Sequence, residues 1–468
     1  MRILWFAWLN FLSFDTAKVH TMNRSRMNLS TWVLLALSGM LLFVYTLPHV
    51  ITLRLFLLVT AFLISARAFL TALRQQQNEL ISALTIYAFL QAWMLVVALF
   101  IADQSIPSLL EWKGQWLTTT LSFVIGIGLA AMLMGAHLRK PSSVIALVVA
   151  IPITLLVVAN NAAVLYDILR QETFITHDPG ITDHTANIGY AIALLEPLLV
   201  ADMLSRIGRR TPLLPVSIWV ASTVLGLSVF ALVIASSRNG LLTMLLAFIF
   251  GGIMMLSELR KIYSPKRIAA VFLIGTLLIL GYVGVALKSD PRWQNFAETV
   301  PIAWDIDRDT RWLNSTGYDL PLSPSGKPVE LSAYNRIAWA HEAWRMLLTH
   351  PWGTEISRDT FYRLELVKYG HAGMAHSHNG WLDFGLNFGF PGLILWATFL
   401  FLLARTGWRA WQEYREPLGF ALILLVVMFA FRALFDSIFR NHMIEQFMLV
   451  AGLLIGALTL NKKRAMST

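Results

Sequence analysis

Apolar residues recur along the chain in runs of roughly 18 to 25 residues, separated by shorter polar segments. A helix of that length crosses the ~30 Å hydrocarbon core of a bilayer and satisfies its own backbone hydrogen bonds. The pattern predicts about twelve transmembrane helices. The predicted spans are residues 31–48, 51–72, 80–102, 116–137, 142–165, 186–204, 213–236, 239–256, 268–287, 384–404, 418–435 and 446–461.

Basic residues are distributed unevenly around these runs. Short clusters such as Arg139 with Lys140, residues 206–210 and residues 462–464 stand beside alternate connections when the spans are counted in order. The positive-inside rule places those connections and both termini in the cytoplasm. Membrane orientation therefore explains the net charge of +10, and no nucleic-acid partner is expected.

The sequence predicts an all-α, polytopic integral membrane protein with one large extramembrane loop. Hydrophobic residues make up 57% of the chain and charged residues only 14%. The predicted parts, in chain order, are a cytoplasmic N-terminal segment (1–30), helices one to nine (31–288), a periplasmic loop (289–383), helices ten to twelve (384–461) and a cytoplasmic tail (462–468).

The first 15 residues are apolar, but they form a short run without a small-residue cleavage site. They predict an interfacial helix. The alternative is that these residues precede the true start of translation, which would then be Met22 or Met27.

The predicted periplasmic connections carry many of the polar residues. Loop 103–115 is brief, loop 166–185 is longer and segment 289–383 is by far the largest. A segment of that length is usually functional or has secondary structure of its own. Helical spacing of apolar residues predicts an amphipathic interfacial helix over residues 333–350, ended by Pro351. Its predicted apolar face consists of Ile337, Ala340, Ala343, Trp344 and Leu347.

Two arginines stand where phosphate chemistry at a membrane surface would need them. Arg238 lies in a Ser-Ser-Arg-Asn-Gly peptide between two apolar runs, and Arg336 lies on the predicted amphipathic helix. A guanidinium group binds phosphate oxygens through its planar fork. Turn capping, snorkelling or a solvated helix face would explain both arginines equally well.

The peptide His-Ser-His-Asn-Gly, residues 376–380, joins the large loop to the next span. Histidine exchanges protons near neutral pH, so His376 and His378 are candidate bases. Asn379 suits a turn into a helix whose N-terminus attracts anions. In an extended lead-in the two rings would point to opposite sides, and only one would reach a substrate. Helix capping is the alternative role.

Metal and nucleotide sites are weakly indicated. Asp305 and Asp307 form a D-x-D pattern that sugar-nucleotide transferases use to hold a cation, but a solvated acidic stretch is the favoured interpretation. His371, His376 and His378 lack the helical i, i+4 spacing of a zinc pair. The chain has no cysteine, P-loop or dinucleotide-binding glycine motif, so we expect neither a metal nor a cofactor.

Several motifs occur together in a recognisable order. They are residues 236–240, 335–339, 350–353 and 378–382, followed by Gly389 and Gly392. In this order and spacing the chain resembles the O-antigen ligase and O-antigen polymerase superfamily of bacterial inner-membrane glycosyltransferases over roughly residues 185–445. Residues 184–189 are similar to the family's asparagine-containing segment and supply Asn187. Residues 436–440 are similar to an arginine-bearing segment and supply Arg440.

The resemblance implies a GT-C-like O-antigen ligase in the inner membrane of a Gram-negative bacterium. The donor would be a polysaccharide on undecaprenyl pyrophosphate, and the acceptor a sugar hydroxyl of lipid A-core, both at the periplasmic face among membrane lipids. His378 would be the catalytic base, and Arg238 and Arg336 would bind the pyrophosphate. Donor or acceptor contacts are expected for His376, Asn379, Asn187 and Arg440.

Three other functions remain open. An O-antigen polymerase would transfer the same donor to another lipid-linked chain, and a protein O-oligosaccharyltransferase would transfer it to a protein. A transporter or flippase would move the lipid-linked sugar without chemistry. The single large loop favours the ligase, because polymerases of this superfamily often have two sizeable periplasmic loops and loop 166–185 is small.

Overall fold

The computed structural model describes residues 27–75, 78–136, 138–171, 178–182, 184–270, 273, 295–313 and 320–467. The predicted N-terminal segment 1–15 and most of the predicted span 268–287 lie outside these residues. The described residues form helices and loops, and their one β-type pairing is an antiparallel bridge between Leu322 and Pro328.

Eight described helices are long and apolar enough to cross a membrane, and three shorter apolar helices accompany them. The prediction of an all-α polytopic membrane protein is therefore confirmed. In order they are α2 (Leu29–Val44), α3 (Ile51–Arg74), α4 (Asn78–Val96) with η2 (Val97–Ile101), α5 (Ser105–Glu111) with η3 (Trp112–Leu117) and α6 (Thr118–Gly135), α7 (Pro141–Gln171), α8 (Thr185–Ile207), α9 (Ile218–Ile234), α10 (Arg238–Ile262), α15 (Gly380–Tyr414), α16 (Pro417–Arg432) and α17 (Asn441–Ser467).

Each predicted span other than 268–287 overlaps one of these helices, but two predicted loops are wrong in extent. Residues 105–115 are helical and lead without a break into α6. Helix α7 continues to Gln171, through polar residues at the start of the predicted loop 166–185. Helices therefore extend beyond the apolar runs that predict them.

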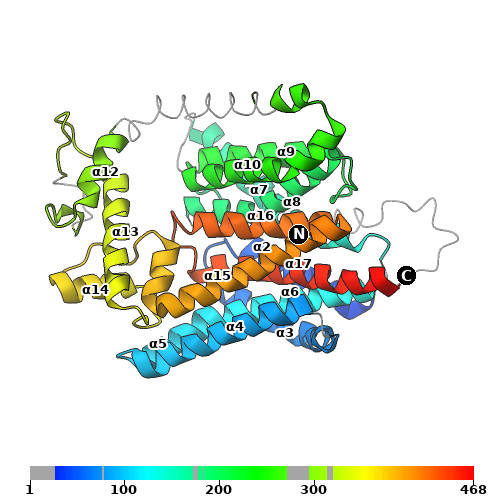
Figure 1. Ribbon diagram of the computed structural model, residues 1–468, viewed down its shortest axis with the longest axis horizontal. Coiled ribbons are helices and arrows are strands. Elements are labelled where there is room, and N and C mark those ends of the chain that lie inside the picture. Colours follow the sequence, from blue (N-terminus) through cyan, green and yellow to red (C-terminus); the bar gives the residue numbers. More distant parts are fainter. Residues whose placement is uncertain are drawn as a thin grey trace.

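The segment between α10 and α15 is predicted to lie outside the membrane and is named the extramembrane segment for that reason. Its described residues fold against one end of the helix bundle (Figure 1). It contains α12 (Phe296–Trp304), η5 (Arg311–Leu313), α13 (Leu331–Thr349) and α14 (Thr360–Tyr369), and α13 runs across the direction of the bundle helices. This segment has a small core of its own, which includes Trp312, Tyr334, Trp339 and Phe361 and reaches Leu386 of α15.

Helix α13 covers the predicted helix 333–350, whose place at the membrane interface stays a prediction, and the predicted apolar face is only partly right. Ala343 and Leu347 are buried as expected, whereas Trp344 is 44% exposed. The residues that face the small core also include Tyr334, Ala338, Trp339 and Met346.

A kink in α15 fixes the contact between the segment and the bundle. Gly389 has a φ of 64°, and a Cβ there would lie 2.3 Å from the carbonyl oxygen of Pro351. The backbone of the 350–353 turn packs directly against the kink, and Phe390 N–H donates to Pro351 O over 2.8 Å. The Phe388 carbonyl accepts 2.7 Å from Trp93 Nε1, so the neighbouring helix satisfies an acceptor at the break.

Candidate active site at the start of helix α15

The two histidines lie in the tight turn that leads into α15. Asn379 is the N-cap, and its Oδ1 accepts from Leu382 N–H over 3.1 Å, a contact worth about 1 kcal/mol. His378 has a φ of 57°, in the left-handed region that non-glycine residues rarely occupy. The predicted extended lead-in is therefore wrong at His378. Instead of pointing to opposite sides, the His376 and His378 rings lie together, with centroids 4.3 Å apart.

A carboxylate holds this turn against the last loop of the bundle. Asp383 Oδ1 accepts from Ser377 N–H at 2.8 Å and from Ser377 Oγ at 2.7 Å. Its Oδ2 accepts from Ser437 Oγ. Gly380 N–H donates to the carbonyls of Ala433, at 2.7 Å, and Asp436, at 3.1 Å. These hydrogen bonds fix the backbone on both sides of His378 and so stabilise its left-handed conformation.

A second anchor ties the same turn to the extramembrane helices. Glu365 of α14 is fully buried and accepts from Gly373 N–H over 3.3 Å. Burial raises the pKa of Glu365 to about 8. Next to it, the buried Glu342 of α13 accepts from Lys368 Nζ over 2.6 Å. Helices α13 and α14 and the histidine turn thus form one packed unit.

Arginines surround the histidine pair. Arg440 Nη1 donates to His376 Nδ1 over 2.6 Å. Arg336 is exposed on α13, and Trp339 from the same helix stacks on His378 with centroids 5.5 Å apart and planes at 20°. The structure therefore gathers four predicted site residues in one place: His376, His378, Arg336 and Arg440.

The surroundings hold both imidazoles in the neutral form. Burial first, then the charges of His378, Arg440 and Arg336, lower the pKa of His376 to about 3. Burial and the Arg336 charge lower the pKa of His378 to about 4, while Asp436 acts in the opposite direction. His378 Nδ1 is buried without a hydrogen-bond partner among the described residues. A neutral imidazole with a vacant nitrogen can accept a proton.

The bundle forms the opposite wall of the site. Tyr190 of α8 donates to Asp436 Oδ2 over 2.7 Å. The buried Arg432, at the end of α16, lies 4.0 Å above the Tyr190 ring and donates to Gly189 O over 2.7 Å. Its Nε and Nη2 atoms have no hydrogen-bond partner among the described residues. A guanidinium with unused donors is suited to an anionic ligand.

Helix α10 begins beside this wall. Arg238 is its first residue, and Asn239 Nδ2 donates to Phe435 O over 3.3 Å. A Cβ at Gly189 would lie 2.8 Å from Ser237 Oγ and 3.2 Å from Arg432 Nη2. The absence of a side chain at Gly189 lets α8, α10 and α16 meet, with Arg238 at their junction.

Asn187 lies in the first turn of α8, one turn before Tyr190. Residues 184–189, the segment that supplies Asn187, therefore reach the site, but the hydrogen bonds to Arg432 and Asp436 are made by the neighbouring Gly189 and Tyr190.

Four residues of the site were not predicted: Tyr190, Asp383, Arg432 and Asp436. The sequence could have indicated Arg432, because an arginine within an otherwise apolar membrane span is energetically costly unless it faces a polar site. Asp383 follows the histidine peptide by one turn of helix, which is a weaker signal. Tyr190 and Asp436 meet only through the tertiary structure, 246 positions apart.

The acidic stretch of the D-x-D pattern lies elsewhere, in the turn that follows α12. Asp307 binds Arg345 over 2.7 Å, and Asp309 binds Arg311 over 2.5 Å. Among the described residues, no group of three or more His, Asp or Glu side chains is arranged to hold a metal ion.

The chain was compared with known proteins. Residues 223–397, which include α10, the extramembrane helices and the histidine turn, match a family model described as O-antigen ligase. This match supports membership of the O-antigen ligase and polymerase superfamily. No curated protein matches the chain. The matched family implies an enzyme activity of the glycosyl-transfer type in O-antigen processing, and it suggests lipid-linked polysaccharide and lipid A-core as substrates in general.

Proposed function

We propose that this superfamily member is an O-antigen ligase that transfers polysaccharide from undecaprenyl pyrophosphate to a sugar hydroxyl of lipid A-core. The observation that carries the proposal is the buried, unpartnered His378 Nδ1 in a turn bordered by Arg336 and Arg440. This arrangement supplies a proton acceptor beside positive charge, the combination that a pyrophosphate leaving group needs.

In the proposed reaction, Arg336 and Arg238 bind the pyrophosphate of the donor. His378 takes the proton of the acceptor hydroxyl while that oxygen forms a bond to the anomeric carbon. The bond from this carbon to the pyrophosphate oxygen breaks, and the lipid pyrophosphate leaves with the electron pair. Attack from the face opposite the leaving group inverts the anomeric centre. Because guanidinium groups neutralise the developing charge, the mechanism is metal-independent.

The low pKa of His378 in the free enzyme is consistent with this role. A base of pKa about 4 is neutral at pH 7 but accepts protons weakly. A bound pyrophosphate would neutralise the Arg336 charge that holds the pKa down and would add negative charge beside the ring. Both changes raise the pKa of His378. Donor binding would therefore strengthen the base when it is needed.

We propose a ligase rather than a polymerase on the length of the connection between α7 and α8. Helix α7 extends to Gln171 and α8 begins at Thr185, so the second periplasmic connection is even shorter than the sequence suggested. The proposed orientation places this connection, residues 289–383 and the site in the periplasm of a Gram-negative inner membrane, with both termini in the cytoplasm. We group the enzyme with the GT-C-like glycosyltransferases.

The test is a reconstituted assay with lipid-linked polysaccharide and lipid A-core in liposomes. Capped lipid A-core is the expected product. Longer lipid-linked chains would identify a polymerase, a glycosylated protein would identify a protein O-oligosaccharyltransferase, and movement of the donor without a new glycosidic bond would identify a transporter.

Metal dependence is tested in the same assay. A chelator should leave the rate unchanged, because arginines rather than a cation meet the pyrophosphate charge. Loss of activity with chelator, restored by magnesium, would contradict the arginine account.

A further inference from the structure

Two buried carboxyl groups that the proposed mechanism does not use lie between α13 and α14. Glu342 of α13 and Glu365 of α14 are fully buried, and the charge of Glu342 acts on Glu365. Lys368 Nζ binds Glu342 Oε1 over 2.6 Å, and Arg345 Nε lies 3.9 Å from Glu342 Oε2. Tyr369 is the remaining titratable neighbour, with its ring centroid 5.0 Å from Lys368 Nζ. Both cations thus pair with Glu342, and Glu365 has no cation partner among the described residues.

The hydrogen bonds of this pair leave one oxygen of each carboxyl group without a partner. Glu365 Oε2 accepts from Gly373 N–H over 3.3 Å, and Glu342 Oε1 accepts from Lys368. The other two oxygens, Glu365 Oε1 and Glu342 Oε2, are buried and have no hydrogen-bond partner in the described part of the chain. Because buried polar atoms are nearly always hydrogen-bonded, both oxygens need a donor.

A single proton would satisfy both oxygens. Two ionised carboxylates only accept hydrogen bonds and repel each other, whereas a neutral carboxylic acid donates one O–H. Burial first, and more weakly the charge of Glu342, raise the pKa of Glu365 to about 8, while hydrogen bonds from the backbone of Gly373 and Met374 act in the opposite direction. Glu365 is therefore mostly protonated at neutral pH, beside a carboxylate that can accept its proton.

We propose that Glu365 is a positioning residue of the histidine turn and shares one proton with Glu342. The proton joins Glu365 Oε1 to Glu342 Oε2 and so holds α14 against α13. Through its other oxygen, Glu365 holds the loop at Gly373, three residues before His376. The effect on transfer rests on the proposed function, whereas the shared proton does not.

The shared proton also acts on His378 through α13. Trp339 lies one turn before Glu342 and stacks on His378, with centroids 5.5 Å apart. Loss of the proton would leave two negative charges in a packed interior, where an ionised group without solvent is costly. Water must then enter between α13 and α14, which moves Trp339 and the loop before the histidines. Transfer should therefore fall as Glu365 ionises.

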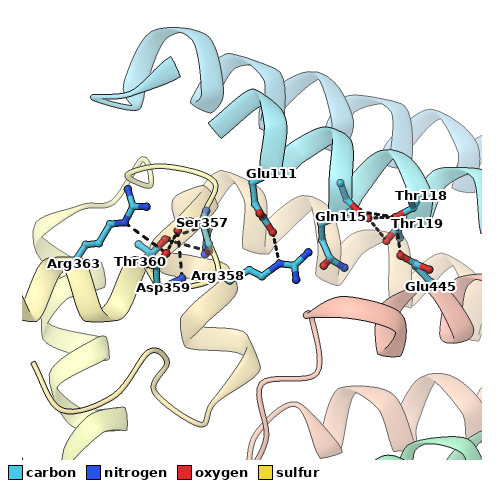
Figure 2. Close-up of polar contacts among 12 residues, drawn as sticks. Glu111, Gln115, Thr118, Thr119, Ser357, Arg358, Asp359, Thr360, Arg363 and Glu445 are labelled. Atoms are coloured by element: carbon cyan, nitrogen blue, oxygen red, sulfur yellow. Dashed lines mark hydrogen bonds and ion pairs between the residues drawn. The ribbon is translucent and has the colours of Figure 1, made fainter. Parts of the chain in front are cut away.

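The start of α14 is held by other contacts. Arg358 forms an ion pair with Glu111 of α5, and Arg363 forms one with Asp359 over 3.5 Å (Figure 2). These ion pairs do not include Glu365. Ionisation of Glu365 should therefore loosen the end of α14 and the loop after it, while the start of the helix stays attached.

The test separates the proton from the packing. Glutamine has the shape of glutamate, and its amide donates to Glu342 without titrating. The kcat/KM of the wild type should fall above about pH 8, whereas Glu365→Gln should transfer at neutral pH and show no such fall. Glu365→Leu fills the space but leaves Glu342 Oε2 without a donor, so it should transfer roughly ten-fold more slowly at neutral pH. An unchanged alkaline fall in Glu365→Gln, or full activity of folded Glu365→Leu, would overturn the proposal.

Glu355→Gln is the matched control. Glu355 lies on the same extramembrane segment and binds Arg363 over 3.0 Å. The substitution removes a carboxyl group without touching the pair between α13 and α14, so the alkaline fall should remain as in the wild type. Its disappearance in Glu355→Gln would assign the titration to another carboxyl group and contradict the role of Glu365.

Two measurements need no substrate. In the infrared difference spectrum between the wild type and Glu365→Gln, the C=O band of a protonated carboxyl group should disappear as the pH rises through about 8. Because an unperturbed glutamate ionises near pH 4.5, the thermal stability of the wild type relative to Glu365→Gln should fall between about pH 4.5 and about 8. A titrating band without any transfer would support the shared proton and contradict the proposed function. Transfer without the band would overturn the shared proton and leave the proposed function standing.

Discussion

At the scale of single residues, the distinction between His376 and His378 follows from their partners. Arg440 donates to His376 Nδ1, which therefore has one nitrogen occupied. His378 Nδ1 is vacant and buried. A base needs a free lone pair. We therefore propose that His378 accepts the proton and that His376 contacts the acceptor glycan.

His378→Ala should lower the transfer rate by roughly 10²–10⁴, the usual contribution of a general base. Donor binding should persist, because Arg336 and Arg238 remain. His376→Ala should retain measurable activity, since it removes a contact rather than the base. Radiolabelled transfer to lipid A-core and equilibrium binding of the donor measure both effects. The opposite ranking would reassign the base.

The Arg336 charge gives a second prediction, which concerns pH. A nearby positive charge disfavours the imidazolium form and lowers the pKa of His378, so Arg336→Gln should raise that pKa towards its usual value. Activity needs the neutral ring and is lost as pH falls through the pKa. The acid limb of kcat/KM for the residual activity of Arg336→Gln should therefore lie at higher pH than that of the wild type.

Arg336→Lys provides the control for charge alone. It keeps the positive charge without the bidentate fork, so the rate should fall while the acid limb stays near its wild-type position. An unchanged acid limb in Arg336→Gln would show that Arg336 does not set the protonation of His378.

At the scale of elements, the kink at Gly389 joins the 350–353 turn to helix α15 of the bundle. The backbone angles of Gly389, φ 64° and ψ −171°, cost a non-glycine residue roughly 1–3 kcal/mol, and a Cβ would also collide with the Pro351 carbonyl. Gly389→Ala should therefore destabilise the fold by more than about 2 kcal/mol and reduce transfer, because the 350–353 turn must move away from α15.

Gly226, in the middle of α9, is the matched control. A Cβ there meets nothing within 4 Å, so Gly226→Ala should leave stability the same or raise it by up to about 1 kcal/mol. Thermal unfolding in detergent compares the two variants. Equal stability of Gly389→Ala and the wild type would show that the kink is not needed for packing.

The sequence predicted the helices better than the site. A membrane span is a local property, because about 20 apolar residues suffice to specify it, and α3, α8 and α16 begin within two residues of the predicted starts. The end of α7 was missed, because residues 166–171 are largely polar and their helix continues past the apolar run. The turn at His378 was missed because hydrogen bonds on both sides impose its backbone: Ser377 N–H donates to Asp383, and Gly380 N–H donates to the distant carbonyls of Ala433 and Asp436.

The arginine and histidine motifs were predictable as motifs, but their partners were not. The peptides around Arg336 and His378 occur in the order typical of the superfamily. Contacts such as Tyr190 with Asp436 depend on how α8 meets the loop between α16 and α17. A single sequence gives no measure of that distance, although Asp436 opens the 436–440 segment that supplies Arg440.

At the scale of the whole molecule, the mechanism requires one orientation in the membrane. The start of α8, the start of α10, the end of α16 and the start of α15 meet at one end of the bundle, and the extramembrane helices cover that end (Figure 1). Glycan donor and acceptor meet in the periplasm in the proposed reaction, so this end must face the periplasm. Positive-inside counting predicts the same orientation, because residues 206–210 then lie in the cytoplasm.

Thiol labelling tests the orientation, since the chain has no cysteine. Ser325 lies on the extramembrane segment and Thr211 in the basic connection between α8 and α9, and both are exposed. Ser325→Cys should react with an impermeant maleimide added to intact spheroplasts, whereas Thr211→Cys should react only after the membrane is opened. Neither variant alters the site, so both should retain transfer activity. Labelling of Thr211→Cys in intact spheroplasts, with Ser325→Cys protected, would place the histidine turn in the cytoplasm, where a donor in the periplasmic leaflet cannot reach it.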